Sequence, residues 1–459
     1  MRVADRLDRL PLSGFHYRLL LLSGLGWLFD SMDGGLMSFV VARLKSEWHL
    51  SPDRVAVLNS AGLAGMFIGG AVAGSLADRF GRKTVFQTTL LVFSIATGLC
   101  ALAQGFWSLL VLRFLVGFGL GGELPVAAAL VSEFAPAKHR GRLVVLLESF
   151  WAFGWAAAAI IAEILARRAE MTGHGFPWRL AFFIGALPAL YLIVLRRVLP
   201  ESPRYLSSCG RLDQAETVIR SIEAESGIPA GSPLQPDSDS APTVRRTPRL
   251  RDLFCGDLAR RTVMLWLLWF TMAYSYYGIF TWLPTLLAGQ GFPLATSFRF
   301  TLIITLAQIP GYFTAAWLVE KIGRKATLIP FMLLCALGSF FFGSARAETD
   351  LILWGCLLSF FNLGAWGVTY GYTPELYPTW LRGTGTGFAA AFGRIGGFLA
   401  PLAVGRLMAG GGCGFTSVFV MFAAVLAAGS LSVVLLGEET RGRTLEEISR
   451  QGRVHPGPE

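Results

Sequence analysis

Charged side chains are scarce in this chain. Only 15% of its 459 residues are Asp, Glu, Lys or Arg, whereas 53% are hydrophobic and the mean hydropathy is +0.54. A soluble domain carries about 25% charged residues, because solvated groups must cover its surface. The scarcity therefore excludes an ordinary soluble fold and predicts an integral membrane protein. A β-barrel is excluded as well, because the apolar segments are long and continuous and do not alternate in polarity.

Cysteine and histidine are also few. The chain has six cysteines and five histidines, and no two cysteines form a Cys-x-x-Cys pair. Cys100, Cys335 and Cys356 fall in apolar runs. This pattern gives no disulfide framework and no metal-binding spacing. No nucleophile and base stand at a suitable spacing either. We therefore expect no metal, no cofactor and no enzymatic activity.

Twelve apolar runs are present, and each is long enough for a spanning helix of about 20 residues. They begin near Arg18, Arg54, Lys83, Trp107, Arg142, Trp178, Arg261, Ser297, Lys325, Asp350, Gly383 and Phe415. The sequence thus predicts an all-α integral membrane protein with two pseudo-symmetric bundles of six helices. We expect an N-terminal bundle at 1–199, a linker at 200–260, a C-terminal bundle at 261–437 and a tail at 438–459.

Basic residues concentrate in the N-terminus, the even-numbered connections and the C-terminus. The positive-inside rule then places both termini in the cytoplasm. The net charge of +10 follows from this topology and does not indicate nucleic-acid binding. No signal peptide is evident, so the first helix should stay in place in the cell membrane. The linker divides into an amphipathic helix around Arg211–Glu225 and a flexible Pro/Ser/Asp-rich tract, 231–242.

Two charged signatures recur 242 residues apart. Gly74-x-x-x-Asp78-Arg79-x-Gly81-Arg82-Lys83 returns as Ala316-x-x-x-Glu320-Lys321-x-Gly323-Arg324-Lys325, and Glu133-x-x-Pro136-x-x-x-Arg140-Gly141 returns as Glu375-x-x-Pro378-x-x-x-Arg382-Gly383. Internal duplication in an apolar chain predicts a transporter of two equivalent halves, with its substrate site between them near the membrane midplane.

The first signature resembles the loop that marks the major facilitator superfamily. The resemblance implies a monomeric carrier whose cytoplasmic side is held closed by two charged latches. One latch would join Asp78 and Arg82 with Glu133 and Arg142; the other would join Glu320 and Arg324 with Glu375 and Arg382. The alternative is a basic loop that only sets the topology.

Several ionisable residues stand at membrane depth, where an ionisable group usually faces a polar cavity. Asp30 and Asp33 share a face of the first helix, and like charges in a low dielectric raise one another's proton affinity. Together with Arg113, Glu123 and Glu148, they are the predicted proton-coupling residues. For each, a structural ion pair or a role in helix packing is the alternative. The Gly117-x-Gly119-x-x-Gly122 string matches a dinucleotide fingerprint, but it lies inside an apolar segment and not after a strand.

Arg394 lies well inside the eleventh predicted helix, which contains no acidic residue. Its planar, permanently charged guanidinium fits a carboxylate bidentately. The alternative is a structural partner on another helix, such as Glu148. Aromatic and amide side chains on other helices complete the predicted binding set for a flat ring. These are Trp151, Trp155, Tyr274, Tyr277, Gln308, Tyr312, Asn362, Trp366 and Tyr370.

Further strings resemble bacterial niacin transporters of the same superfamily. They include Gly26-Trp-Leu-Phe-Asp-Ser-Met-Asp33, Gly121-Gly-Glu-Leu-Pro-Val126, Ser359-Phe-Phe-Asn-Leu-Gly-Ala-Trp-Gly367 and Ala391-Phe-Gly-Arg-Ile-Gly-Gly397. The resemblance implies import of nicotinate, or a similar aromatic carboxylate, by alternating access with proton coupling. Another aromatic acid, nicotinamide or a sugar are the alternative substrates, since Pro200-Glu-Ser-Pro-Arg-Tyr-Leu206 and the tail resemble sugar porters. A ligand-binding membrane sensor is the alternative outside transport.

Overall fold

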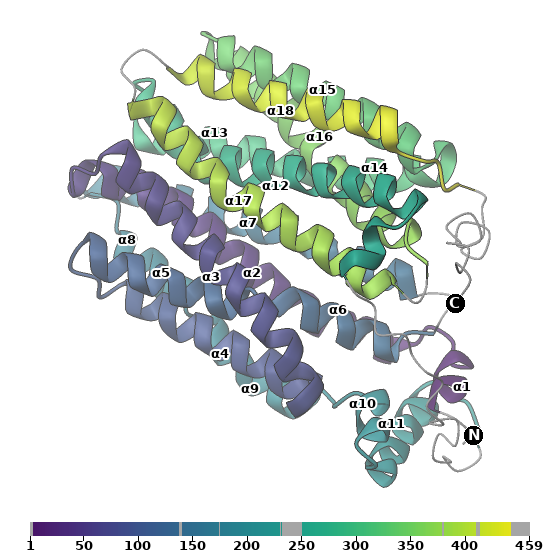
Figure 1. Ribbon diagram of the computed structural model, residues 1–459. Coiled ribbons are helices and arrows are strands. Elements are labelled where there is room, and N and C mark those ends of the chain that lie inside the picture. Colours follow the sequence, from purple (N-terminus) through teal and green to yellow (C-terminus); the bar gives the residue numbers. More distant parts are fainter. Residues whose placement is uncertain are drawn as a thin grey trace. The chain divides into compact units, whose positions relative to one another are not determined.

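The computed structural model describes residues 3–136, 140–173, 175–229, 231, 250–378, 381–409 and 414–441, apart from some side chains inside helices. Every regular element in these ranges is helical (Figure 1). Nine segments of the described chain are long and apolar enough to cross a membrane. The segments α2 (Gly14–Glu47) and α3 (Pro52–Phe80) are not among those nine, and α5 (Phe106–Leu120) is a shorter apolar helix.

The twelve predicted runs are confirmed as helical segments. In the first half, α2 and α3 are followed by α4 (Arg82–Cys100), α5 with α6 (Glu123–Phe134), α7 (Arg140–Thr172), and α8 (Trp178–Gly185) with α9 (Pro188–Val198). In the second half lie α12 (Asp257–Gly289), α13 (Leu294–Leu306) with α14 (Gln308–Ile322), α15 (Arg324–Ser344), α16 (Glu348–Glu375), α17 (Arg382–Ala409) and α18 (Phe415–Leu436). Three runs are therefore interrupted helices, broken at Gly121–Gly122, at Ala186–Leu187 and at Ala307.

Outside the spans lie α1 (Val3–Asp8), α10 (Pro203–Ser208), α11 (Leu212–Glu225) and the 3-10 turn η1 (Leu250–Phe254). The predicted helix around Arg211–Glu225 is thus present as α11. Arg6 of α1 is fully buried and donates to Glu223 and Glu216 of α11 at 2.6 Å each. Burial acts to raise the pKa of Glu223, but the hydrogen bonds from Arg6 and Gly231 outweigh it and hold that pKa below its ordinary value. The predicted flexible tract falls outside the described residues, except Gly231.

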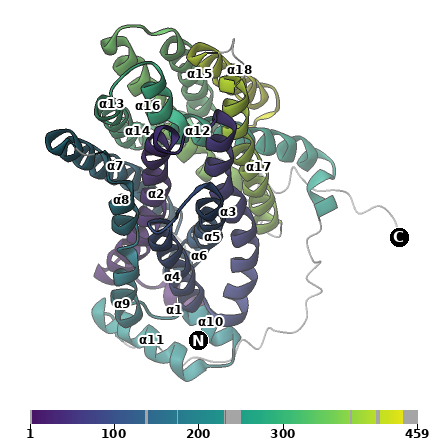
Figure 2. The same cartoon turned by 90° about the vertical axis from the view of Figure 1, so that its left-hand side faces the viewer.

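Contacts divide the chain into two compact units. Unit 1 contains Met1–Asp33, Ala64–Trp155 and Trp178–Arg246; unit 2 contains Gly34–Leu63, Ala156–Pro177 and Thr247–Glu459. The division follows contacts and cuts α2, α3 and α7, so the boundaries at 199, 260 and 437 stay predictions. Within unit 2, α12 packs against α16, α17 and α18, and Figure 2 shows α13, α14 and α16 side by side.

Candidate functional site

An aromatic cluster lies between α12 and α16 of unit 2. The ring of Trp366 lies 5.5 Å from Tyr276, 6.3 Å from Tyr277, 6.0 Å from Tyr370 and 6.0 Å from Trp269. Tyr276 and Trp269 are buried, whereas Tyr277, Trp366 and Tyr370 are partly exposed. The cluster therefore exposes parts of three large rings that could contact a ligand, and the two buried rings pack against them.

Two amides border this cluster, and neither has its hydrogen bonds complete. Gln308 begins α14 directly after the break at Ala307, and its Oε1 accepts from the Tyr276 hydroxyl at 3.5 Å. Asn362 donates to Ser275 at 3.1 Å. Within the described residues, the buried Nε2 of Gln308 and Oδ1 of Asn362 have no partner. A buried polar atom without a partner costs roughly 1–3 kcal/mol, so one buried donor and one buried acceptor are left unsatisfied next to the cluster.

Arg394 is partly exposed on α17, on a stretch where glycines bring that helix close to α12. A Cβ on Gly393 would lie 3.0 Å from the carbonyl oxygen of Trp269, and one on Gly397 would lie 2.9 Å from the Tyr277 ring. Small residues at such a contact let two helices approach closely. The same two α12 residues belong to the aromatic cluster, so the backbone around Arg394 adjoins it within unit 2.

Other predicted binding residues lie elsewhere. Tyr274 faces α18, where its hydroxyl donates to the Met421 sulfur at 3.2 Å. The ring of Tyr312 packs against α16 at Gly367, because a Cβ added to that glycine would lie 2.8 Å from the ring. Trp151 and Trp155 belong to unit 1, where the rings of Trp151 and Trp27 lie 4.7 Å apart and are tilted by 40° to one another. Trp269, Tyr276 and Trp27 were not in the predicted set. The spacing of seven residues between Trp269 and Tyr276 could have placed both on one helix face.

In unit 1, Asp33 forms a buried ion pair. Arg113 donates through Nη2 to Oδ2 at 2.8 Å and through Nη1 to Oδ1 at 3.3 Å, and the Thr97 hydroxyl donates to Oδ1 at 2.7 Å. Asp33 is 1% exposed and Arg113 is 4% exposed. Sequence reasoning expected Asp30 and Asp33 to act on one another as like charges. In the structure the charge of Asp33 is instead compensated by a fork-shaped donor.

Glu123, Glu148 and Asp30 are the other predicted carboxyls of unit 1. Glu123 is fully buried at the start of α6, and its Oε2 accepts from the Thr89 hydroxyl at 3.0 Å. Among the described residues, nothing donates to its Oε1. Glu148 on α7 is 4% exposed and forms no ion pair with any described residue. Asp30 is buried on α2.

The repeated signatures form two equivalent charged corners, one in each unit. Gly81, with φ 97°, precedes α4, and Gly323, with φ 102°, precedes α15. Arg82 bonds Glu133 at 2.9 Å, and Arg324 bonds Glu375 at 2.8 Å. Each ion pair joins helices of one unit. Whether either pair acts as a latch stays a prediction.

The structure gives no ion pair for the four remaining residues of the predicted latches. The side chains of Asp78, Arg142 and Arg382 lie outside the described part of the structure, and Glu320 is exposed.

Each corner also contains a carboxylate that sequence reasoning did not assign to it. Glu201 accepts from the backbone N–H groups of Arg82 and Lys83 at 3.0 and 3.2 Å. Glu439 accepts from Arg324, Lys325 and Ala326 at 2.9, 3.0 and 3.2 Å. Both are acceptors at a helix start, where unpaired N–H groups favour negative charge. The signal lay in the Pro200-Glu201 string and in Gly437-Glu438-Glu439 at the start of the tail, because both place a Glu shortly after a spanning helix.

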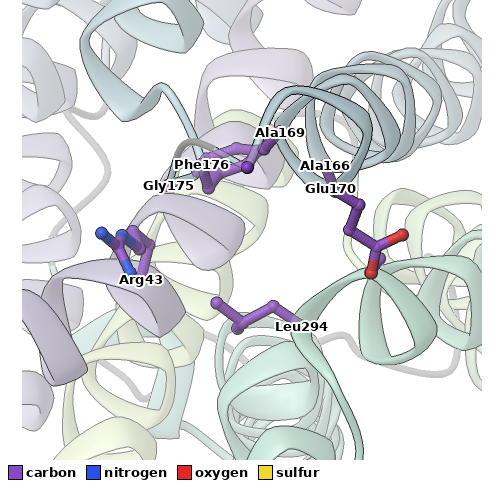
Figure 3. Close-up of a pocket in the computed structure, with 9 residues that line it drawn as sticks. Arg43, Ala166, Ala169, Glu170, Gly175, Phe176 and Leu294 are labelled. Atoms are coloured by element: carbon purple, nitrogen blue, oxygen red, sulfur yellow. The ribbon is translucent and has the colours of Figure 1, made fainter.

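A separate cavity of about 310 Å³ is lined by residues of unit 2 (Figure 3). Arg43 and Glu170 stand on opposite sides of it, with Phe176 and Leu294 between them. Arg43 already bonds Glu47 at 3.1 Å. None of the predicted substrate or proton residues lines this cavity, so it is distinct from the aromatic cluster.

Comparison with known proteins agrees with this architecture. The family described as "Sugar (and other) transporter" matches residues 32–451. The chain belongs to this transporter family. It is therefore a multi-pass membrane transporter of the major facilitator superfamily and not an enzyme. A solved partially occluded, inward-open xylose transporter XylE from E. coli shares the fold, with a TM-score of 0.73 and 20% identity over 93% of this chain and 100% of that one.

Two curated relatives are more similar in sequence. The niacin transporter NiaP of Acinetobacter baylyi is 48% identical over 98% of this chain and 100% of its own length. The putative niacin/nicotinamide transporter NiaP of Bacillus subtilis is 44% identical over 94% of this chain and 98% of its own length. Similarity of this extent covers both units and all twelve helical segments.

Proposed function

We propose that this protein imports nicotinate, or a closely similar small aromatic carboxylate, by alternating access coupled to protons. The observation that carries the proposal is the partly exposed aromatic cluster of Tyr277, Trp366 and Tyr370, which adjoins the stretch of α17 that carries Arg394. The full-length similarity to two proteins named for niacin supports the same substrate.

Each part of nicotinate has a complementary group in unit 2. The guanidinium of Arg394 would bind the carboxylate bidentately. The rings around Trp366 would stack on the flat pyridine or meet its edge. The pyridine nitrogen is an acceptor, and the unpartnered Nε2 of Gln308 is a donor. Tyr274, Tyr312 and Asn362 would support this site within unit 2. The assignment of Trp151 and Trp155 to substrate binding stays a prediction.

Proton coupling would use the charged residues of unit 1: Asp30, Asp33, Arg113, Glu123 and Glu148. One proton carried with one carboxylate anion makes the cycle electroneutral, so an inward proton gradient would drive import. The charged corners at Gly81 and Gly323 would act as cytoplasmic latches. We further propose that the protein acts as a monomer in the inner membrane with both termini in the cytoplasm, and that the predicted domain boundaries hold.

Uptake of labelled nicotinate into proteoliposomes tests this proposal. Nicotinate uptake should saturate, and unlabelled nicotinate and benzoate should compete more strongly than glucose. Competition by nicotinamide shows whether the carboxylate is required, since nicotinamide keeps the ring and loses the charge. Competition by glucose but not by benzoate would contradict the anion site.

Replacing the central ring sharpens the test. Trp366→Ala removes the side chain that touches four other rings, so we expect the affinity for nicotinate to fall by about tenfold or more, roughly 1.4 kcal/mol. Trp354→Ala is the matched control on α16, because Trp354 stacks on Phe341 at 4.5 Å and, in the described part of the structure, makes no ring contact with the cluster. Equal losses in the two variants would argue against a binding role for Trp366.

A further inference from the structure

The cavity in Figure 3 is a part of unit 2 that the proposed import does not use. Its nine lining residues come from the end of α2, from the end of α7 and the residues that follow it, and from the start of α13. Its volume of about 310 Å³ lies at the lower end of the range for small-molecule sites, roughly 300–1,000 Å³. The cavity is therefore large enough for a small ligand built on one ring.

A guanidinium with unused donors forms one side of the cavity. The Nε of Arg43 donates to Glu47 at 3.1 Å, and no described residue accepts a hydrogen bond from Nη1 or Nη2. A Cβ on Gly175 would lie 2.4 Å from Nη2, so glycine at this position leaves room for the guanidinium. Glu47 and the backbone at Gly175 thus position the guanidinium, and two of its nitrogens stay available to a carboxylate.

The opposite side of the cavity is acidic. Glu170 of α7 is exposed, lines the cavity and forms no ion pair with a described residue. A ligand with only a negative charge would be attracted by Arg43, which Glu47 already partly neutralises, and repelled by Glu170. A ligand with an anionic group at one end and a cationic group at the other would meet an opposite charge on both sides.

The wall between the two charges is apolar and closely packed. Phe176 and Leu294 line it. The ring of Phe298 lies 5.2 Å from the ring of Phe176 and 4.9 Å from that of Phe39, which precedes Arg43 by about one helical turn. All three phenylalanines are buried. The apolar body of a ligand would therefore rest on a wall that is already formed.

We propose that this cavity is a second binding site, which takes a small zwitterion of the pyridinium carboxylate class. The carboxylate would accept hydrogen bonds from Nη1 and Nη2 of Arg43, the cationic ring nitrogen would face Glu170, and the ring would pack against Phe176. The inference goes beyond the proposed import of nicotinate, because the cavity shares no lining residue with the aromatic cluster or with Arg394.

Binding of labelled N-methylnicotinate to purified protein tests the site, because this probe has a carboxylate and a permanent positive charge on its ring nitrogen. The parent protein is Arg394→Ala, which lacks the anion-binding group of the proposed transport site. We expect saturable binding that Arg43→Gln and Glu170→Gln each weaken about fivefold, as for the loss of one partly exposed ion pair. Arg167→Gln should bind as the parent does, because Arg167 lies on α7 outside the cavity lining and pairs with Glu163 at 2.7 Å.

Wild-type protein gives the same test without the Arg394 substitution. Saturating unlabelled nicotinate should displace N-methylnicotinate from the transport site and leave a component of binding that Glu170→Gln weakens. Glu170 is exposed, so this variant should fold as wild type does. Complete displacement by nicotinate would overturn the second site.

Ligands that keep only one of the two charges test the proposed chemistry. Benzoate keeps the carboxylate and N-methylnicotinamide keeps the cationic nitrogen, so each should compete for the cavity about fivefold more weakly than N-methylnicotinate. Glycerophosphoethanolamine is a zwitterion without a ring, and stronger competition by this compound would assign the cavity to a lipid headgroup and overturn the ligand class. Absence of saturable binding, or binding that neither Arg43→Gln nor Glu170→Gln weakens, would overturn the site. These outcomes are independent of transport, since protein that imports no nicotinate can still bind the probe in this cavity.

Discussion

The two charged corners of the molecule are built alike, whereas the interiors of the two units are not. At both corners a glycine with positive φ precedes a helix, an arginine bonds a glutamate, and a second glutamate accepts from the helix start. In the interior, unit 1 holds acidic residues and Arg113, and unit 2 holds aromatic rings, amides and Arg394. The difference indicates that duplication kept the structural corners and that the interiors diverged toward separate chemical tasks.

The largest expected effect comes from removing the charge in unit 2. Arg394→Ala should abolish saturable nicotinate transport, because no other residue of the proposed site supplies a full positive charge for the carboxylate. Arg394→Lys should recover part of the affinity, since it restores the charge and not the fork. Arg406→Ala, an exposed arginine on the same helix, should transport as wild type. An unchanged KM in Arg394→Ala would show that the side chain is structural.

Breaking the interior ion pair of unit 1 should lower the stability of the fold. Asp33→Asn leaves Arg113 buried without its counter-charge, which costs about 3–5 kcal/mol. Thermal unfolding in detergent should show a large fall in Tm, and Asp33→Asn combined with Arg113→Leu should recover much of it. A Tm near that of wild type in Asp33→Asn would mean that the pair carries little of the fold's stability.

The corners should respond equally to the same change. Gly81 and Gly323 adopt backbone angles that are nearly restricted to glycine, and a Cβ would lie 2.3 Å from a Glu201 oxygen or 2.5 Å from the Glu439 carboxyl carbon. Alanine at either position should cost about 1–3 kcal/mol. Gly387→Ala is the control, because nothing lies within 4 Å of that added carbon. A loss at only one corner would break the structural equivalence.

Features that depend on residues close together in the sequence could be predicted, whereas contacts between residues far apart in the sequence could not. The twelve helices follow from runs of apolar residues, and the Arg82–Glu133 contact follows from a repeated signature. Asp33 and Arg113 are distant in sequence, and no periodicity links them, so their pairing required the packing of α2 against its neighbours. The Trp269 ring was missed because aromatic residues are common in every span and their facing depends on helix rotation.

The smallest expected effect concerns acid stability at the second corner. Burial acts to raise the pKa of Glu439, but backbone N–H groups, those of Arg441 and Arg324 foremost, outweigh it and hold the pKa below the ordinary value. A depressed pKa contributes stability above the unfolded value of about 4.3, and this is lost as the pH falls through the folded pKa. Glu439→Gln should therefore flatten the acid limb of Tm against pH. An acid limb as steep as that of wild type would contradict this.

The central claim is that the two interiors divide the work, with the carboxylate bound in unit 2 and the proton carried in unit 1. Equilibrium binding of labelled nicotinate to purified Arg394→Ala and Glu123→Gln at neutral pH tests it most directly. The account predicts that Arg394→Ala loses specific binding and that Glu123→Gln binds nicotinate with an affinity close to that of wild type. Specific binding retained by Arg394→Ala and lost by Glu123→Gln would contradict it.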